Sequence, residues 1–222
     1  MNTRILLLSA FVLMAWTVSA QTRTQYGVLP AINLNKKINA RYKLNFKLEG
    51  RQRLFQQGES AADYQLTDLA LVLARRMGLD HSLAGGYLIR FREGERIHRL
   101  IQQWAFEGGF TNLGLVHRFV LDQTFAPSEA AQFRLRYRAA IQFPLSGQSL
   151  NERELYLKMS NEYLGELQAA EYDLEIRLVL ALGYRITDNN KLELGLDNRY
   201  DAFLRDEGRL RAWSTLTWYR AF

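Results

Sequence analysis

Apolar and polar residues alternate along most of this chain with a period of two, which is the pattern of β-strands whose two faces meet different surroundings. Around Arg136, for example, Leu135 and Tyr137 share one face, and Arg134, Arg136 and Arg138 share the other. Three arginines on one strand face are unusual for a protein core, where charged side chains are almost never fully buried unless paired. The alternation predicts an all-β fold in which each strand has one apolar and one charged face.

The alternating segments are long. The segments that we expect to be strands are 26–34, 42–49, 64–77, 80–93, 95–108, 111–122, 133–143, 153–164, 172–184, 190–201 and 208–222. Many exceed the roughly 5 or 6 residues of an average soluble strand and reach the roughly 9 to 11 needed to cross a membrane. Bacterial single-chain barrels have an even number of strands. We therefore expect this count of eleven to be wrong by one. Either the first segment, which contains Pro30, lies partly outside the barrel wall, or a short strand was missed, so we predict ten to twelve strands.

The connections between these segments are predicted to alternate in length. Short ones, rich in turn-forming residues, are expected at 35–39, 78–81, 108–112, 144–149 and 187–190. Longer polar ones are expected at 56–63, 122–130, 164–171 and 203–208. Short turns at one rim and longer loops at the other are typical of outer-membrane barrels, in which the short turns face the periplasm.

Alternation alone would also fit a soluble barrel or sandwich with its apolar face inward. Two features favour the opposite arrangement. Aromatic residues lie near the ends of apolar rows, as at Tyr172 and Tyr184, which is typical of membrane-interface girdles. The last strand carries Leu216, Trp218 and Phe222 on one face, which resembles the assembly signal of outer-membrane barrels, although Arg220 interrupts it. The sequence therefore predicts a closed antiparallel up-and-down transmembrane β-barrel with its apolar face toward lipid.

The N-terminus has the features of a secretory signal peptide. Arg4 precedes an apolar run from Ile5 to Val18, and small residues lead to an expected cleavage between Ala20 and Gln21. We expect residues 1–20 to be the signal peptide and residues 21–222 to form one outer-membrane domain. The sequence contains no cysteine, which excludes disulfides, thiolate chemistry and a lipidated cysteine. Expected partners are the outer-membrane bilayer and, during biogenesis, the barrel assembly machinery and periplasmic chaperones.

If the apolar rows face lipid, the charged rows line the interior. The residues expected there are Arg51, Arg53, Arg90, Arg92, Glu107, Arg118, Arg134, Arg136, Arg138, Glu154, Lys158, Glu162, Glu175, Arg177, Glu193 and Asp197. Because unpaired buried charges are costly, arginines should meet carboxylates across neighbouring strands. These charges could satisfy one another and set strand register, or they could form a narrow pathway or an anion site on Arg134, Arg136 and Arg138.

Several short motifs carry a family resemblance. They are His117-Arg118, the run from Arg134 to Arg138, Asn161-Glu162, and the run from Gly183 to Arg185, each on an expected strand. In their order and spacing the chain resembles the bacterial family called domain of unknown function 2490, over roughly residues 24 to 220. The resemblance implies an outer-membrane β-barrel without an assigned activity and supplies no catalytic residues. The family commonly has a Trp near the mature N-terminus, where this sequence has Tyr26.

Other chemistry has little support in the sequence. Among the histidines, His81 falls in a short turn, His98 follows the loop at 93–96, and His117 lies in the lipid-facing row, with no serine reliably beside them. No residue cluster has metal-ligand spacing, no glycine pair begins a phosphate loop, and no basic stripe suggests nucleic acid. We expect no cofactor and no catalysis. The main hypothesis is a structural or small-solute outer-membrane barrel. The alternatives are a soluble periplasmic ligand-binding barrel and an outer-membrane lipid-modifying enzyme.

Overall fold

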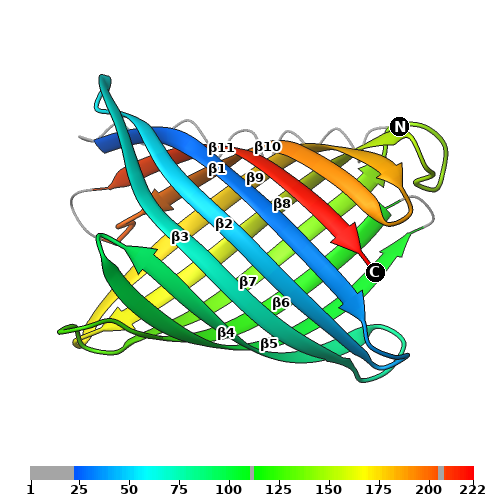
Figure 1. Ribbon diagram of the computed structural model, residues 1–222, viewed down its shortest axis with the longest axis horizontal. Coiled ribbons are helices and arrows are strands. Elements are labelled where there is room, and N and C mark those ends of the chain that lie inside the picture. The colour runs from blue at the N-terminus through cyan, green and yellow to red at the C-terminus, as the bar shows by residue number, and fades with distance from the viewer. Residues whose placement is uncertain (1–22, 111–112, 205–207) are drawn as a thin grey trace.

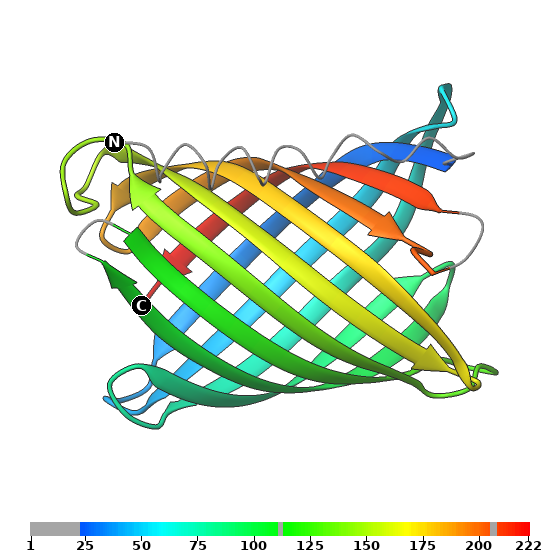
Figure 2. The same ribbon diagram turned by 180° about the vertical axis from the view of Figure 1, so that it is seen from behind.

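The computed structural model describes residues 23–110, 113–204 and 208–222, so the expected signal peptide with Ala20 and Gln21 lies outside the described residues. Within those ranges the chain forms one closed β-barrel whose strands are inclined to its long axis (Figures 1 and 2). The strands are β1 (Arg23–Lys37), β2 (Tyr42–Gln56), β3 (Glu59–Arg76), β4 (His81–Arg92), β5 (Glu95–Phe110), β6 (Leu113–Phe125), β7 (Gln132–Pro144), β8 (Glu154–Gln168), β9 (Glu171–Thr187), β10 (Asn190–Asp201) and β11 (Arg209–Ala221). The predicted all-β closed barrel is confirmed.

The barrel closes between its first and last strands. Consecutive strands pair antiparallel, whereas β1 and β11 pair parallel, from Arg23↔Arg209 to Asn35↔Ala221. Both arrowheads point to the same rim in Figure 1. An up-and-down chain with an odd number of strands must close in this way, because its first and last strands run in the same direction. The eleven strands of the described residues match the count of alternating segments, so the expectation of an even number was wrong.

The first strand is part of the barrel wall, although it contains a proline. β1 pairs with both β2 and β11 along most of its length. Its pairing with β2 skips Leu29 and Pro30, between Val28↔Gln52 and Ala31↔Glu49. Proline has no N–H to donate and is tolerated where a ladder is irregular. The suggestion that this segment lies partly outside the wall is therefore wrong.

The connections do not alternate in length as predicted. We call the first rim the one where β1 begins and the second rim the one where β1 ends. The loops predicted at 56–63, 93–96 and 164–171 are two-residue turns at the first rim, at 57–58, 93–94 and 169–170. They are shorter because the strands continue through polar residues. The β2–β3 hairpin consequently projects beyond the rest of this rim (Figure 1). The longest connection, 145–153, lies at the second rim, where short turns were expected.

The two faces of the wall differ sharply in chemistry. Large apolar side chains are exposed on the outside, and Leu135 and Leu194 are 64% and 61% exposed. Charged side chains are buried on the inside, where Asp122 is 0% and Arg199 is 3% exposed. Buried apolar residues that pack together form a small cluster of Leu29, Ala31 and Trp213. This is the reverse of a soluble barrel, whose interior is apolar.

Candidate functional site

The interior of the barrel is a polar cavity of about 1360 Å³. Its lining includes Lys37 and Phe222 at the second rim and Glu129 and Asp201 at the first rim. The cavity therefore reaches both ends of the barrel. Because period-two strands send every second side chain inward, it is lined by the inner row of each strand. These rows carry most of the charged residues and also apolar ones, such as Val72 and Ile101.

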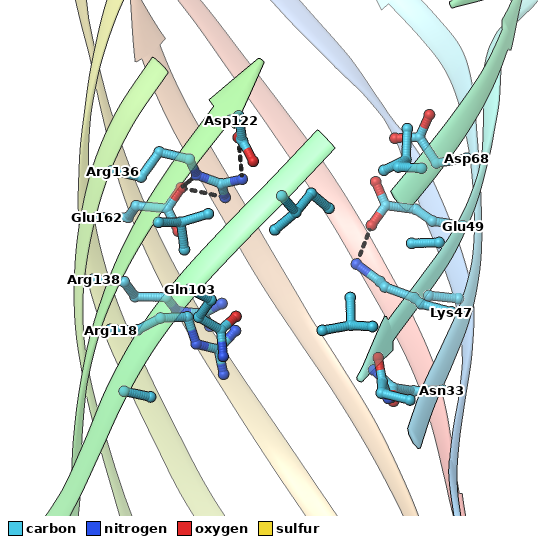
Figure 3. Close-up of a pocket in the computed structure, with 18 of the residues that line it drawn as sticks. Asn33, Lys47, Glu49, Asp68, Gln103, Arg118, Asp122, Arg136, Arg138 and Glu162 are labelled. Atoms are coloured by element: carbon cyan, nitrogen blue, oxygen red, sulfur yellow. Dashed lines mark hydrogen bonds and ion pairs between the residues drawn. The ribbon is translucent and has the colours of Figure 1, made fainter. Parts of the chain in front are cut away.

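A chain of ion pairs runs from strand to strand along the inner face of β6 to β11. It begins with the Asp122 carboxylate, which accepts hydrogen bonds from Arg134 at 3.1 Å and from Arg136 at 3.2 Å. Arg136 also contacts Glu162 at 2.6 Å (Figure 3). Since Arg134 and Arg136 extend from β7 toward β6 and β8, one carboxylate on each neighbouring strand pairs with these two arginines.

The same chain continues around the barrel. Arg177 contacts Glu162 at 3.3 Å and Glu175 at 2.6 Å, and Arg211 contacts Glu175 at 3.7 Å and Asp201 at 2.9 Å. We call these residues the lumen ion-pair chain. Its members are Arg134, Asp122, Arg136, Glu162, Arg177, Glu175, Arg211 and Asp201. Alternating charges that share partners stabilise each other, because every buried ion keeps an opposite charge nearby.

The facing wall carries a second, smaller group of ion pairs, which we call the Glu49 group. Glu49 contacts Lys47 at 2.5 Å and Arg51 at 2.7 Å, and Asp68 accepts two hydrogen bonds from Arg90, each of 2.7 Å. Figure 3 shows Lys47 and Glu49 on the opposite side of the cavity from Arg136 and Glu162. The lumen thus has ion pairs on both walls rather than a single charged stripe.

A third group surrounds Glu193 on β10. Lys158 donates to both carboxylate oxygens, at 3.0 and 2.8 Å. The hydroxyls of Tyr156 and Tyr219 donate to the same carboxylate at 2.8 and 3.1 Å. Both oxygens of this carboxylate therefore have two donors each inside the barrel.

Most of the chain matches the model of one protein family. The model described as Protein of unknown function (DUF2490) matches residues 15–207. The chain belongs to this family. No curated protein and no solved structure matches it. The resemblance inferred from the strand motifs is therefore confirmed, and the family description assigns no activity to this DUF2490 protein.

Most of the predicted lumen residues of this DUF2490 protein line the cavity. They are Arg51, Arg90, Arg92, Glu107, Arg118, Arg134, Arg136, Arg138, Lys158, Glu162, Glu175, Arg177, Glu193 and Asp197. Two others lie at the rims. Arg53 pairs with Asp63 at 2.7 Å near the first rim. Glu154 accepts hydrogen bonds from the backbone and side chain of Asn151 at the second rim.

Sequence reasoning missed several carboxylates of the site, above all Asp122. That residue was predicted to begin a loop, but it lies inside β6 and is completely buried. Asp68 and Asp201, on β3 and β10, were also not singled out. All three side chains point inward. Asp122 shares its strand face with Arg118, Asp68 with Ala70, and Asp201 with Asp197. Continuing the alternation through polar residues would have found them.

The outer wall satisfies its histidines with tyrosine hydroxyls. The Tyr87 hydroxyl lies 2.5 Å from His98 Nδ1, and the Tyr137 hydroxyl lies 2.8 Å from His117 Nδ1. His81, expected in a turn, is the first residue of β4 and lies 3.4 Å from Asp80. The imidazoles of His98 and His117 thus have hydrogen-bond partners on the apolar surface, which reduces the free-energy cost of placing them there.

The described residues contain neither a cluster of three or more His, Cys, Asp or Glu placed to hold a metal nor a helix suited to crossing a bilayer. The residues of the expected assembly signal lie at the end of the wall. Leu216 and Trp218 are exposed on the outside of β11, and Phe222 follows this strand.

Proposed function

We propose that this DUF2490 protein is a β-barrel of a Gram-negative outer membrane and that its charged lumen is a narrow pathway for small solutes, without catalysis. The observation that carries the proposal is the inverted wall, with exposed Leu, Phe, Tyr and Trp side chains outside and ion pairs inside. Burial of an apolar side chain is worth about 1.5 to 3 kcal/mol, so water around this surface would be very unfavourable.

The inverted wall argues against a soluble periplasmic barrel. Such a protein would place its apolar row around an internal ligand and its charged row in water. Here Asp122 and Glu162 are buried inside, while Leu135 and Tyr163 are exposed outside. Lipid acyl chains would cover these exposed apolar side chains, as on the outer faces of known membrane barrels.

The pathway part of the proposal rests on the cavity. It reaches both rims, and its lining is polar enough to hold water and small ions. The lumen ion-pair chain occupies much of one wall, which reduces the free cross-section. We therefore expect conductance far below the nanosiemens scale of wide porins.

Membrane fractionation tests the location. The full chain, expressed with its N-terminal segment, should appear in the outer-membrane fraction and migrate differently in mild detergent before and after boiling. Arrest of processing by Ala20→Arg gives a control for export. Recovery of the mature chain as a detergent-free soluble protein would contradict the proposal.

Planar-bilayer recordings test the pathway. The refolded barrel should give small, steady conductance that depends on salt, and liposome swelling should be limited to small solutes. Large nanosiemens channels would contradict a narrow lumen. Complete absence of conductance and swelling in correctly inserted barrels would leave a structural role in place of the pathway.

A further inference from the structure

A neighbouring pair of lumen arginines, one on β6 and one on β7, stands apart from the ion pairs. The lysines and arginines of the lumen ion-pair chain, the Glu49 group and the Glu193 group each have a carboxylate within 4.0 Å. Across residues 23–110, 113–204 and 208–222, no carboxylate lies within this distance of Arg118 or Arg138. Both side chains line the cavity.

These two arginines face each other. Arg118 on β6 and Arg138 on β7 are direct cross-strand partners. Like charges in directly opposite positions destabilise a strand pair. Glu162, the cross-strand partner of Arg138 on β8, turns its carboxylate to Arg136 and Arg177 instead. Two cations therefore lie opposite each other, and the carboxylate across from Arg138 already pairs with other arginines.

Their hydrogen-bonding capacity is largely unused among the described residues. Arg138 donates one hydrogen bond to Ser160 Oγ at 2.9 Å. The buried Nε of Arg118 has no partner among the described residues. Guanidinium groups carry five donors in a planar fork that matches oxyanions. Most of these donors remain available to a ligand in the cavity.

The neighbouring side chains are compatible with an anion. Gln103, on β5, lines the same cavity and adds an amide group. Its cross-strand partner Val120 is two residues from Arg118 on the inner face of β6, and Figure 3 shows Gln103 and Arg118 projecting into the same region. Lys158 and Tyr219 also interact electrostatically with both arginines, although they donate their hydrogen bonds to Glu193. The result is a local excess of positive charge on the cavity wall.

Arg99 is a weaker candidate for such a site. It too lacks a carboxylate at ion-pair distance within the described ranges, but it is only 5% exposed and donates to Thr124 Oγ1 at 2.9 Å. Arg118 and Arg138 are half-buried, so a ligand in the lumen can reach them. Of these two candidates, the Arg118–Arg138 pair is therefore the accessible one.

We propose that Arg118 and Arg138, with Gln103 beside them, form a binding site for a small oxyanion, a phosphate or a carboxylate, within the lumen. The inference rests on the proposed function, because it names the class of solute that the pathway would admit. The bound anion would accept hydrogen bonds from both guanidinium groups and remove their mutual repulsion. Charge-assisted bonds of this kind are the strong ones in proteins.

Calorimetric titration of the refolded barrel in detergent tests the site. The probes are inorganic phosphate, acetate and hexanoate at constant ionic strength, which separate a phosphate from a carboxylate and a carboxylate with a hydrocarbon body. At least one probe should bind the unmodified chain. Arg118→Gln and Arg138→Gln should each weaken that binding by about tenfold or more, the loss expected for a hydrogen bond to a charged group.

Arg96→Gln is the matched control, because it removes one positive charge from an exposed position at the first rim. It should leave binding unchanged. Arg138→Lys keeps the charge and should retain most of the affinity. Arg118→Gln should also refold at least as well as the parent chain without ligand, since it removes a like-charge contact.

Equal binding by the parent chain and by the Arg118→Gln and Arg138→Gln double variant, or no binding of any probe, would overturn the site. The assay needs neither a membrane nor conduction. If the barrel fractionates with the outer membrane but no probe binds in the titration, this inference alone is refuted. Binding by a chain that fractionates as a soluble protein would refute the proposed location alone.

Discussion

The ring of Tyr156 on β8 lies directly over the Cα of Gly183, its cross-strand partner on β9. The ring is completely buried, and its hydroxyl reaches Glu193 on the next strand. A Cβ at position 183 would overlap ring atoms of Tyr156. The glycine thus lets an aromatic side chain lie flat against the inner wall and anchor a carboxylate two strands away.

Gly183→Ala should destabilise the barrel, because the ring and its hydrogen bond to Glu193 must move. Overpacking of this kind costs about 1 to 3 kcal/mol. The measurement is the free energy of unfolding in urea, with the barrel in detergent or lipid vesicles. Gly85→Ala is the control, since a Cβ there meets nothing within 4 Å. Equal stabilities of the two variants would show that the close approach has no energetic weight.

Glu162→Gln should break the centre of the lumen ion-pair chain. Its carboxylate is 6% exposed and contacts both Arg136 and Arg177. Removal of one partner from a buried ion pair costs roughly 3 kcal/mol, because an uncompensated charge remains. The same urea titration measures the loss, and Glu95→Gln at an exposed position on β5 should have no such effect. Unchanged stability would mean that lumen water screens these charges.

Ala170→Gly should stabilise the β8–β9 turn. Ala169 and Ala170 both have left-handed backbone angles, with φ of 49° and 66°. Left-handed conformation costs a residue with a Cβ about 1 to 2 kcal/mol, and glycine avoids most of this cost. A gain of about 1 kcal/mol in unfolding free energy is expected. Gly58→Ala, at φ +86°, should change stability in the opposite direction.

Leu194→Arg tests which medium surrounds the outer wall. Leu194 is 61% exposed and lies in β10 between Leu182 and Leu216. If acyl chains cover it, the arginine should cost about 2 to 4 kcal/mol and reduce refolding into lipid vesicles. Leu79→Arg, in a rim turn and 91% exposed, is the matched control and should be nearly neutral. A neutral Leu194→Arg would contradict a lipid-facing wall.

Local alternation was enough to predict the strands and the sharing of faces. Arg134, Arg136 and Arg138 do lie on one face and Leu135 on the other, since this depends only on the period of an extended backbone. The same rule failed where polar residues continued a strand, as at Asp122, because such residues were interpreted as loop. In an inverted barrel, polar residues are the normal inner row of a strand.

What the sequence by itself determined is therefore the all-β fold, the alternation of each strand and the membership of the family. The tertiary structure alone decided the parallel closure of β1 with β11 and the pairing of each arginine with its carboxylate. The reason is physical. Alternation is a property of neighbouring residues, whereas ion pairing depends on the stagger between strands that closure imposes. That stagger leaves Arg118 opposite Arg138 without a carboxylate in the part of the chain that the structure describes.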